Sequence, residues 1–366
     1  MRLFFVTGSL VHGGAERHAI TLANRLAERG HEVHFTYVRN DPSQLPRLQV
    51  SSDCLHARRY ADFSAVQRLK ESFRRIRPTV VLATNPYALM YASLARPGAP
   101  LAVSLHSTFT RNAKEWLQML AYRPLFWTAD RAMFVCRRQM LHWRRRGLFA
   151  RSNEVIYNGV DLDYWAPRQA VPHDDFVIGL SAVLRPEKNP VQLVEAVAML
   201  RRRGIPARAL LIGDGEMRPA IEAAAVRLGV SSQVAITGLV QDVRPHLAGC
   251  DALALTSHTE ALSLAAIEAM ALGLPVVHAD VGGAAEMIRP GHDGFLFPAG
   301  DTGTLVDCLA ALANRDVRLP MGRNARRTAE TRFSERAMVE RYEGSLVQLA
   351  SIRSKRESLR RSATAH

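Results

Sequence analysis

Two glutamates, Glu260 and Glu268, are separated by seven residues within the segment TSHTEALSLAAIEAMALGLPVV, residues 256–277. Glu260 follows a predicted strand that ends near Thr256, at the edge of a parallel sheet where ligands usually bind. Glu268 lies about one turn inside an alanine- and leucine-rich helix that is predicted to end at Gly273. The spacing therefore places two carboxylates around the start of one helix.

Ser263 stands at the predicted start of this helix, as its N-cap. The backbone N–H groups of Leu264 and Ala265 then have no acceptor within the helix, and with the positive end of the helix dipole they suit a phosphate. The carboxylate oxygens of Glu268 can accept hydrogen bonds from a vicinal diol, such as that of ribose, while Glu260 lies on the other side of the phosphates. The pattern indicates a site for a nucleoside diphosphate sugar.

Two cations follow the strand predicted for FVIGL, residues 176–180, in the segment SAVLRPEKN. Lys188 is the main candidate for contact with the diphosphate, and Arg185 is the second. Positive charge at this place also stabilises the negative charge that develops on a departing diphosphate.

The segment TGSLVHGGAERHA, residues 7–19, is spaced like a phosphate-binding loop, but Gly14 stands where such a loop has its lysine. Gly13 and Gly14 lack side chains, so the backbone of this first domain can approach the diphosphate of the nucleotide sugar, while the cations come from the second domain. A purely structural tight turn is the alternative. A dinucleotide site is disfavoured because the G-x-G-x-x-G spacing is absent.

Several motifs together, in this order along the chain, resemble the retaining glycosyltransferases of family four, the group 1 type that acts in cell-envelope polysaccharide and lipopolysaccharide biosynthesis. They are GGAE (13–16), VIYNGVD (155–161), LRPEKN (184–189), LLIGDGE (210–216), the Glu260–Glu268 pair, VGGAAEMI (281–288) and GHDGFLFPAGD (291–301). The resemblance covers nearly the whole chain and implies the GT-B fold, in which the second of two facing Rossmann-like domains holds most of the donor. The chain departs from the family at Val183, where an arginine is usual, and Arg185 is the candidate substitute.

The resemblance also implies residue roles. His106, at the end of the apolar run LAVSLH, would contact the transferred sugar near the reacting carbon, and Lys188 and Glu260 would complete the catalytic set. It further implies retention through a front-face displacement, in which the departing diphosphate oxygen helps to deprotonate the acceptor hydroxyl. Asn158 would shape the hinge between the domains.

We therefore expect a hexosyltransferase that moves a sugar from a nucleotide donor, UDP being favoured over GDP, to a hydroxyl of a cell-envelope glycan or glycolipid. No cofactor and no metal are expected, because the pair Asp161 and Asp163 lies in the predicted linker and cations already neutralise the diphosphate. Two alternatives remain open: a sugar-nucleotide epimerase or hydrolase of the same architecture, and a non-catalytic basic binding protein.

Apolar runs alternate with helical stretches along the chain, which predicts α/β structure with two doubly wound parallel sheets. The expected strands are RLFFV, EVHFTYV, TVVLAT, LAVSLH and RAMFV, then FVIGL, ARALLIG, QVAITG, DALALTS, LPVVHAD and GFLFP. We expect domains at 1–165 and 170–333, joined through a linker over 153–175. A helix near 335–352 should pack back on the first domain, and 353–366 should form a basic flexible tail.

The net charge of +14 is uneven, with 25 Lys and Arg against 12 Asp and Glu in residues 1–170 and 23 against 22 in the remainder. In CRRQMLHWRRRGLF, residues 136–149, helical spacing places Met140 and Trp143 beside one basic flank. Its members are Arg137, Arg138, Arg144 and Arg145. Such a flank suits an anionic membrane surface, and a solvated arginine face is the alternative. Nucleic acid is not an expected partner because no stacking or groove-reading module is present.

No apolar run approaches the roughly 20 residues that span a bilayer, and the N-terminal segment MRLFFVTG does not have the features of a signal peptide. The four cysteines lack metal-ligand spacing and are expected to be reduced thiols. The sequence therefore predicts a cytoplasmic protein, with the inner face of the cytoplasmic membrane as the surface that the basic flank would contact.

Overall fold

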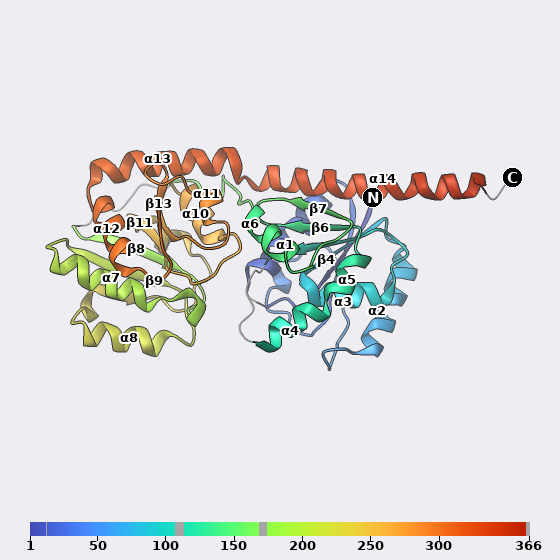
Figure 1. Ribbon diagram of the computed structural model, residues 1–366, viewed down its shortest axis with the longest axis horizontal. Helices are drawn as coiled ribbons and strands as arrows, with labels where there is room; N and C mark the ends of the chain where they lie inside the picture. Colours follow the sequence, from blue (N-terminus) through green and yellow to red (C-terminus); the bar gives the residue numbers. More distant parts are fainter. Residues whose placement is uncertain (12, 107–112, 168–173, 364–366) are drawn as a thin grey trace. The chain divides into compact units, whose positions relative to one another are not determined.

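The structure, a computed structural model, describes residues 1–11, 13–106, 113–167 and 174–363. The chain divides into two compact units. The first contains Met1–Tyr157 and Met338–His366, and the second contains Asn158–Ala337. Each unit is built on one parallel sheet with helices on both faces (Figure 1), so the predicted α/β class with two doubly wound sheets is confirmed.

The first sheet has seven strands in the order β3-β2-β1-β4-β5-β6-β7. They are β1 (Arg2–Thr7), β2 (Glu32–Tyr37), β3 (Ser51–Cys54), β4 (Val80–Thr84), β5 (Leu101–Leu105), β6 (Arg131–Phe134) and β7 (Ser152–Val155). The helices are α1 (Gly14–Glu28), α2 (Phe63–Ile76), α3 (Asn85–Ala95), α4 (Ala113–Ala121), α5 (Arg123–Thr128) and α6 (Arg137–Arg144), together with the part of α14 (Glu335–Ala363) that belongs to this unit. A 3-10 turn spans Leu45–Arg47.

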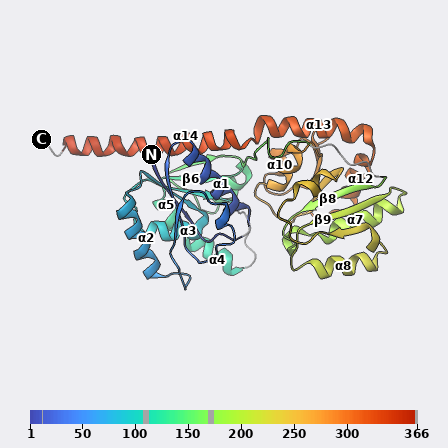
Figure 2. The ribbon, with the colours of Figure 1, turned by 180° about the vertical axis from the view of Figure 1, so that it is seen from behind.

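Strand β1 shows why this sheet is covered on both sides, because its side chains alternate between two separate cores. Phe4 and Val6 pack with residues of α2 and α3, whereas Leu3 and Phe5 pack with residues of α1 and α14. Figure 2 shows α1 and α14 near one another in this unit. A strand buried on both faces must be apolar throughout, which explains the continuous run RLFFV.

Helix α14 is fixed to the first sheet by a buried arginine of β6. The guanidinium of Arg131 donates hydrogen bonds to Ser345 Oγ at 2.6 Å and to Gln348 Oε1 at 2.8 Å. The helix continues to Ala363. The segment after Gly344 contains neither Gly nor Pro and is rich in good helix formers, which explains its helical conformation. The flexibility of the basic tail stays a prediction.

The second sheet has six strands in the order β10-β9-β8-β11-β12-β13. They are β8 (Phe176–Ser181), β9 (Ala207–Ile212), β10 (Val234–Ile236), β11 (Ala252–Leu255), β12 (Val276–Ala279) and β13 (Gly294–Phe297). The helices are α7 (Val191–Arg202), α8 (Arg218–Arg227), α9 (Arg244–Ala248), α10 (Leu264–Ala271), α11 (Ala284–Met287), α12 (Thr302–Ala313) and α13 (Arg315–Arg332), with 3-10 turns at Pro186–Lys188 and Ser231–Gln233.

Every strand expected from an apolar run is present, but two strands, β3 and β7, were not predicted. Their sequences, SSDC and SNEV, are polar and lie at the two edges of the first sheet. Strand β7 also corrects the predicted linker over 153–175, because residues 153–155 pair with β6. All four cysteines are free thiols. Within the described part of the chain, no helix combines the length and apolar character needed to cross a membrane.

Candidate functional site

Two loops of the second unit bring Lys188 and Glu260 together. The loops follow β8 and β11, which are neighbours in the sheet, so they leave it at the same edge. The Nζ atom of Lys188 lies 2.5 Å from Oε1 of Glu260, and Ser257 Oγ donates to the same oxygen at 3.1 Å. Both ion-paired side chains are mostly buried, at 25% and 15% exposure. Partial burial lowers the local dielectric and so strengthens the attraction between the two charges.

Further hydrogen bonds tie the same two loops to each other. The hydroxyl of Thr256 is shared between the carbonyl oxygens of Lys188 and Asn189, at 2.9 Å each. The N–H of His258 donates to Glu187 O at 2.9 Å. These bonds join the two loops to each other, so the position of the ion pair is fixed by contacts of the backbone as well as by its charges.

Helix α10 begins next to these two loops, with Ser263 as its N-cap, as the sequence predicts. The Oγ atom of Ser263 accepts from the N–H of Ala266 at 3.3 Å. Leu264 and Ala265, the first two residues of the helix, are partly exposed. Glu268 is only 4% exposed, so it is not a solvated helix residue. A carboxylate buried at this depth requires polar partners.

Arg185 starts the turn that ends at Lys188, but its side chain lies apart from the ion pair. Its Nη1 atom is 4.0 Å from Glu187 Oε1, and the side chain is 45% exposed. Val183, which stands at the usual arginine position of the family, is 38% exposed. Arg185 therefore belongs to the same loop as Lys188 but is not paired with Glu260.

His278 of β12 is a buried residue of this region that the sequence analysis missed, because it lies inside the apolar run LPVVHAD. Its Nδ1 atom is 2.7 Å from the carbonyl oxygen of Ala279, so Nδ1 carries the proton and donates. Its Nε2 atom is buried and has no hydrogen-bond partner among the described residues. Burial lowers the pKa of His278; the charge of Glu260 opposes that shift and the charge of Lys188 adds to it.

In the first unit, Gly13 is the N-cap of α1 and Gly14 its first residue. The side chain of Glu16 folds back over Gly13, so that a Cβ at Gly13 would lie 2.3 Å from Glu16 Oε2. Burial raises the pKa of this carboxyl group. The end of the flexible Glu16 side chain can move aside, so the backbone at Gly13 and Gly14 is accessible to a ligand.

His106 directly follows β5, and its N–H donates to Asn85 Oδ1 at 3.1 Å. Its ring packs against His18 of α1 at 4.4 Å between centroids, and His18 packs against Tyr342 of α14 at 5.2 Å. The Nε2 atoms of both histidines and the Tyr342 hydroxyl are buried without hydrogen-bond partners in the described ranges. Burial lowers the pKa of His106 to about 4, so its imidazole is neutral at pH 7.

Comparison with known proteins bears on the family and the fold. A family model described as Glycosyltransferase Family 4 matches residues 12–164, and one described as Glycosyl transferases group 1 matches residues 163–328. The chain belongs to the GT-B glycosyltransferases. HepE of Anabaena, solved in complex with UDP-glucose, is 22% identical, with a TM-score of 0.85 over 95% of this chain and 100% of the other.

Curated relatives of this GT-B glycosyltransferase match smaller parts. The D-inositol 3-phosphate glycosyltransferase of Saccharomonospora viridis is 34% identical over 205 residues, 50% of this chain and 47% of the relative. The Vi polysaccharide biosynthesis protein VipC/TviE of Salmonella typhi is 26% identical over 69% of this chain and 41% of the relative. The matched part thus spans less than half of either relative's length.

In this GT-B glycosyltransferase, Asp161 and Asp163 serve a local turn. Asp161 Oδ1 accepts from the N–H groups of Asp163 and Tyr164, at 3.0 Å each. Such an arrangement is typical of aspartate in turns. No group of three or more His, Cys, Asp or Glu residues that could hold a metal ion is found among the described residues.

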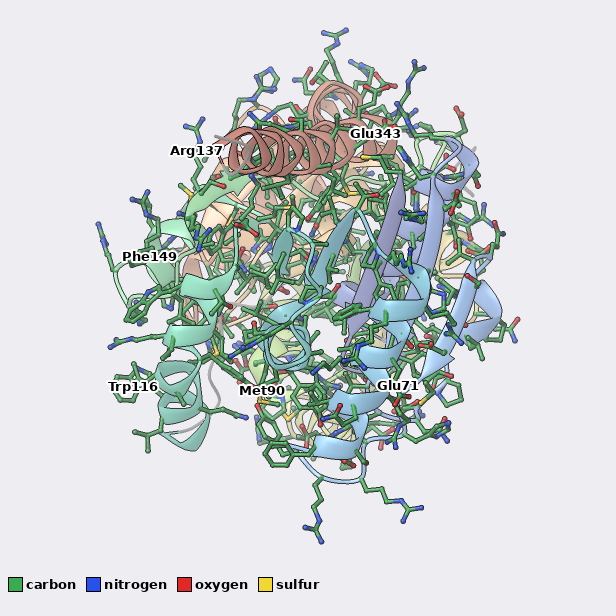
Figure 3. The ribbon with its side chains drawn as sticks, turned by 90° about the vertical axis from the view of Figure 1, so that its right-hand side faces the viewer. Glu71, Met90, Trp116, Arg137, Phe149 and Glu343 are labelled. Carbon is green, nitrogen blue, oxygen red and sulfur yellow. The ribbon has the colours of Figure 1, made fainter. Side chains whose placement is uncertain are left out.

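Helix α6 corrects one expectation about the basic flank. The four arginines of this flank are exposed: Arg137, Arg138 and Arg144 on the helix, and Arg145 at its C-cap. Trp143, however, is 2% exposed and packs in the core of the first unit, so the predicted aromatic edge is wrong. Exposed aromatic residues of the first unit include Phe149 at 40%, Trp127 of α5 at 54% and Trp116 of α4 at 46%. In Figure 3, Arg137, Phe149 and Trp116 lie along one side of the molecule.

Proposed function

We propose that this protein is a retaining, metal-independent hexosyltransferase that moves a sugar from a UDP-sugar to a hydroxyl of a cell-envelope glycan or glycolipid. The observation that carries the proposal is the Lys188–Glu260 ion pair beside the start of α10, with Glu268 buried one turn into that helix. A cation, a helix N-terminus and a buried carboxylate together match the diphosphate and the ribose of such a donor.

In the proposed complex, the N–H groups of Leu264 and Ala265 donate to the phosphates, and the carboxylate of Glu268 accepts from the ribose hydroxyls. The ammonium of Lys188 has donors to spare while it is paired with Glu260, so it can bind the diphosphate and still hold the carboxylate. Arg185, exposed on the same loop, adds positive charge. This charge takes the place of a metal ion when the diphosphate departs.

The first unit contributes Gly13, Gly14 and His106. Because burial keeps the imidazole of His106 neutral, one ring nitrogen can accept a hydrogen bond and the other can donate one. A neutral histidine beside the transferred sugar can therefore bind its hydroxyls without adding charge at the reacting carbon. The glycine pair leaves the backbone accessible at the start of α1.

The reaction follows the family mechanism. The bond between the anomeric carbon and the phosphate oxygen breaks, and the acceptor oxygen bonds to that carbon on the same face. The proton of the acceptor hydroxyl passes to the departing phosphate oxygen, so no carboxylate nucleophile is needed. The anomeric configuration of the product, read by NMR, tests retention directly.

The nature of donor and acceptor rests on relatives. HepE was solved with UDP-glucose, which supports a UDP-hexose, and VipC/TviE acts in polysaccharide biosynthesis, which supports an envelope glycan. The basic residues of α6 would hold the enzyme against an anionic membrane surface that carries such an acceptor.

The deciding experiment is a thermal-shift screen with UDP-glucose, UDP-galactose, UDP-N-acetylglucosamine and GDP-mannose, followed by transfer assays with lipid-linked and soluble glycan acceptors. A donor that binds the folded protein raises its melting temperature. Release or conversion of the sugar without acceptor identifies a hydrolase or an epimerase instead. Failure to bind any nucleotide sugar would instead support the alternative of a non-catalytic binding protein that only shares the fold.

A further inference from the structure

Three successive carbonyl groups, those of Glu260, Ala261 and Leu262, are each contacted by residues that are distant in sequence. The Nδ2 atom of Asn158 donates to Leu262 O at 3.1 Å, across 104 positions. The N–H of Gly283 donates to Ala261 O at 2.6 Å. These contacts hold the backbone between the glutamate of the ion pair and the N-cap of α10.

Gly282 lies very close to the backbone of the same segment. A Cβ atom at this position would lie 2.1 Å from Glu260 O and 2.7 Å from Ala261 O, distances that backbone atoms do not tolerate. Its φ angle of +54° also falls in the left-handed region that favours glycine. The loop can therefore take this position only because residue 282 has no side chain.

Asn158 is buried, with 5% exposure, and its use of hydrogen bonds is incomplete. Its Oδ1 atom is buried without a partner among the residues that the structure describes, so the hydrogen bond to Leu262 O uses only the Nδ2 end of the amide. A buried acceptor without a hydrogen-bond partner lowers the stability of the fold. A role in stability alone therefore does not explain why an asparagine stands at position 158.

We propose that Asn158 and Gly282 are positioning residues of the donor site. They fix the backbone of residues 260–262, and through it the distance between the Glu260 carboxylate and the first N–H groups of α10. Neither residue touches the donor. This inference rests on the proposed function, because it concerns the geometry that would bind and transfer the sugar, where an error of about 1 Å can cost on the order of 100-fold in rate.

The first test compares Asn158→Ala with Asn324→Ala. Asn324 lies in the same unit and also donates its Nδ2 to a distant carbonyl, that of His292, at 3.0 Å. We expect UDP to bind at least fivefold more weakly to Asn158→Ala, with a kcat at least tenfold lower, while Asn324→Ala matches the wild type in both. Asn158→Asp keeps the shape but loses the donor, so it should not restore activity. Equal UDP affinity and kcat in the two alanine variants would overturn the proposal.

The second test uses a matched pair of glycines. Gly300 has a φ of +85°, and a Cβ there would meet nothing within 4 Å, whereas Gly282 faces two carbonyl groups. Gly282→Ala and Gly300→Ala share the backbone strain, but only the former should displace the loop. We expect a loss of UDP binding in Gly282→Ala alone. The inference is wrong if Gly300→Ala weakens binding to the same extent.

Amide hydrogen exchange of residues 260–266 separates this inference from the proposed function, because it needs no substrate. Exchange at these residues should be faster in Asn158→Ala than in the wild type and unchanged in Asn324→Ala. Unchanged exchange in Asn158→Ala refutes the positioning role whatever the enzyme does. If exchange rises as expected but the wild type binds no UDP-sugar, the loop is held as described and the proposed function is what fails.

Discussion

The Nζ atom of Lys188 and the Oε1 atom of Glu260 lie 2.5 Å apart, although the two residues are 72 positions apart in the chain. The pair forms where two neighbouring parallel strands end, and Ser257 adds a third group to the same carboxylate. A cation held in this way is poised before any ligand arrives. Such preorganisation favours stabilisation of charge that develops during a reaction.

Replacing Lys188 by alanine should lower kcat by about 100- to 1,000-fold, the range for loss of one group that stabilises developing charge. The variant also leaves the Glu260 carboxylate without its cation in a mostly buried site. Steady-state kinetics at saturating donor measure the effect. Lys70→Ala, on α2 of the first unit, is the control and should match the wild type. A kcat within twofold of the wild type in Lys188→Ala would place the active site elsewhere.

Glu268→Ala should weaken binding of the nucleotide by about 10- to 100-fold. The estimate follows from the roughly 1.5 to 3 kcal/mol that hydrogen bonds to a charged group contribute. Calorimetric titration with UDP measures it, since UDP carries the ribose without the sugar. Glu222→Ala removes an exposed glutamate of α8 in the same unit and should bind UDP normally. Wild-type affinity in Glu268→Ala would exclude the ribose role.

Acidification should destabilise the first unit through His106, whose pKa burial lowers to about 4. The unfolded chain has a histidine pKa near 6.5 and binds the proton more tightly, so stability falls as the pH drops from about 6.5 toward 4 and is unaffected by this group above that window. Between pH 7 and 5 the loss is at most on the order of 2 kcal/mol. His18, whose pKa is also lowered, acts in the same direction.

Urea unfolding of His106→Gln at pH 7 and pH 5 checks this assignment. The difference in unfolding free energy between the two pH values should be smaller than in the wild type. The exposed His56 supplies the control, because His56→Asn should keep the wild-type difference. An unchanged difference in His106→Gln would show that the histidine is accessible to protons in the folded state.

In the proposed mechanism, Lys188 and Arg185 supply the positive charge that a metal ion supplies in other glycosyltransferases, so chelation should leave transfer activity intact. The assay compares initial rates with and without excess EDTA, at constant ionic strength. Loss of activity with EDTA and its return with Mn²⁺ would contradict the metal-independent mechanism and direct attention to Asp161 and Asp163.

Changing the four exposed arginines of α6 and its C-terminal end to glutamine should abolish sedimentation with anionic vesicles and leave UDP binding unchanged. These residues are Arg137, Arg138, Arg144 and Arg145. Salt above physiological strength should release the wild type too, because the attraction decays within about 8 Å at 0.15 M. The control removes equal charge elsewhere in the first unit, at Arg58, Arg59, Arg74 and Arg77. A wild type that remains in the supernatant at low salt would exclude membrane attachment.

Strands buried on both faces could be predicted because burial itself dictates their composition, as in FVIGL and LPVVHAD. Edge strands carry no such requirement, and so β3 and β7 gave no signal. The helix start at Ser263 was predictable for a similar reason, since an N-cap depends on local hydrogen bonding.

Contacts between distant segments were not predictable in this way. Helical spacing could group Trp143 with the arginines of α6 but could not show which face of the helix meets the sheet. The bond from Asn158 to Leu262 and the approach of Gly282 to Glu260 depend on how loops meet in space. No periodicity encodes such a meeting, so the sequence analysis assigned Asn158 only to the hinge and gave Gly282 no role of its own.

The core of the first unit includes Met338, Val339, Tyr342, Leu346 and Leu349, which pack with residues from the first 156 positions. The second unit, by contrast, is one uninterrupted stretch, Asn158–Ala337. During synthesis on the ribosome, the second unit therefore has its whole sequence available while the first still lacks the part of its core that α14 supplies. The part of the protein that is translated first is the part that completes its folding last.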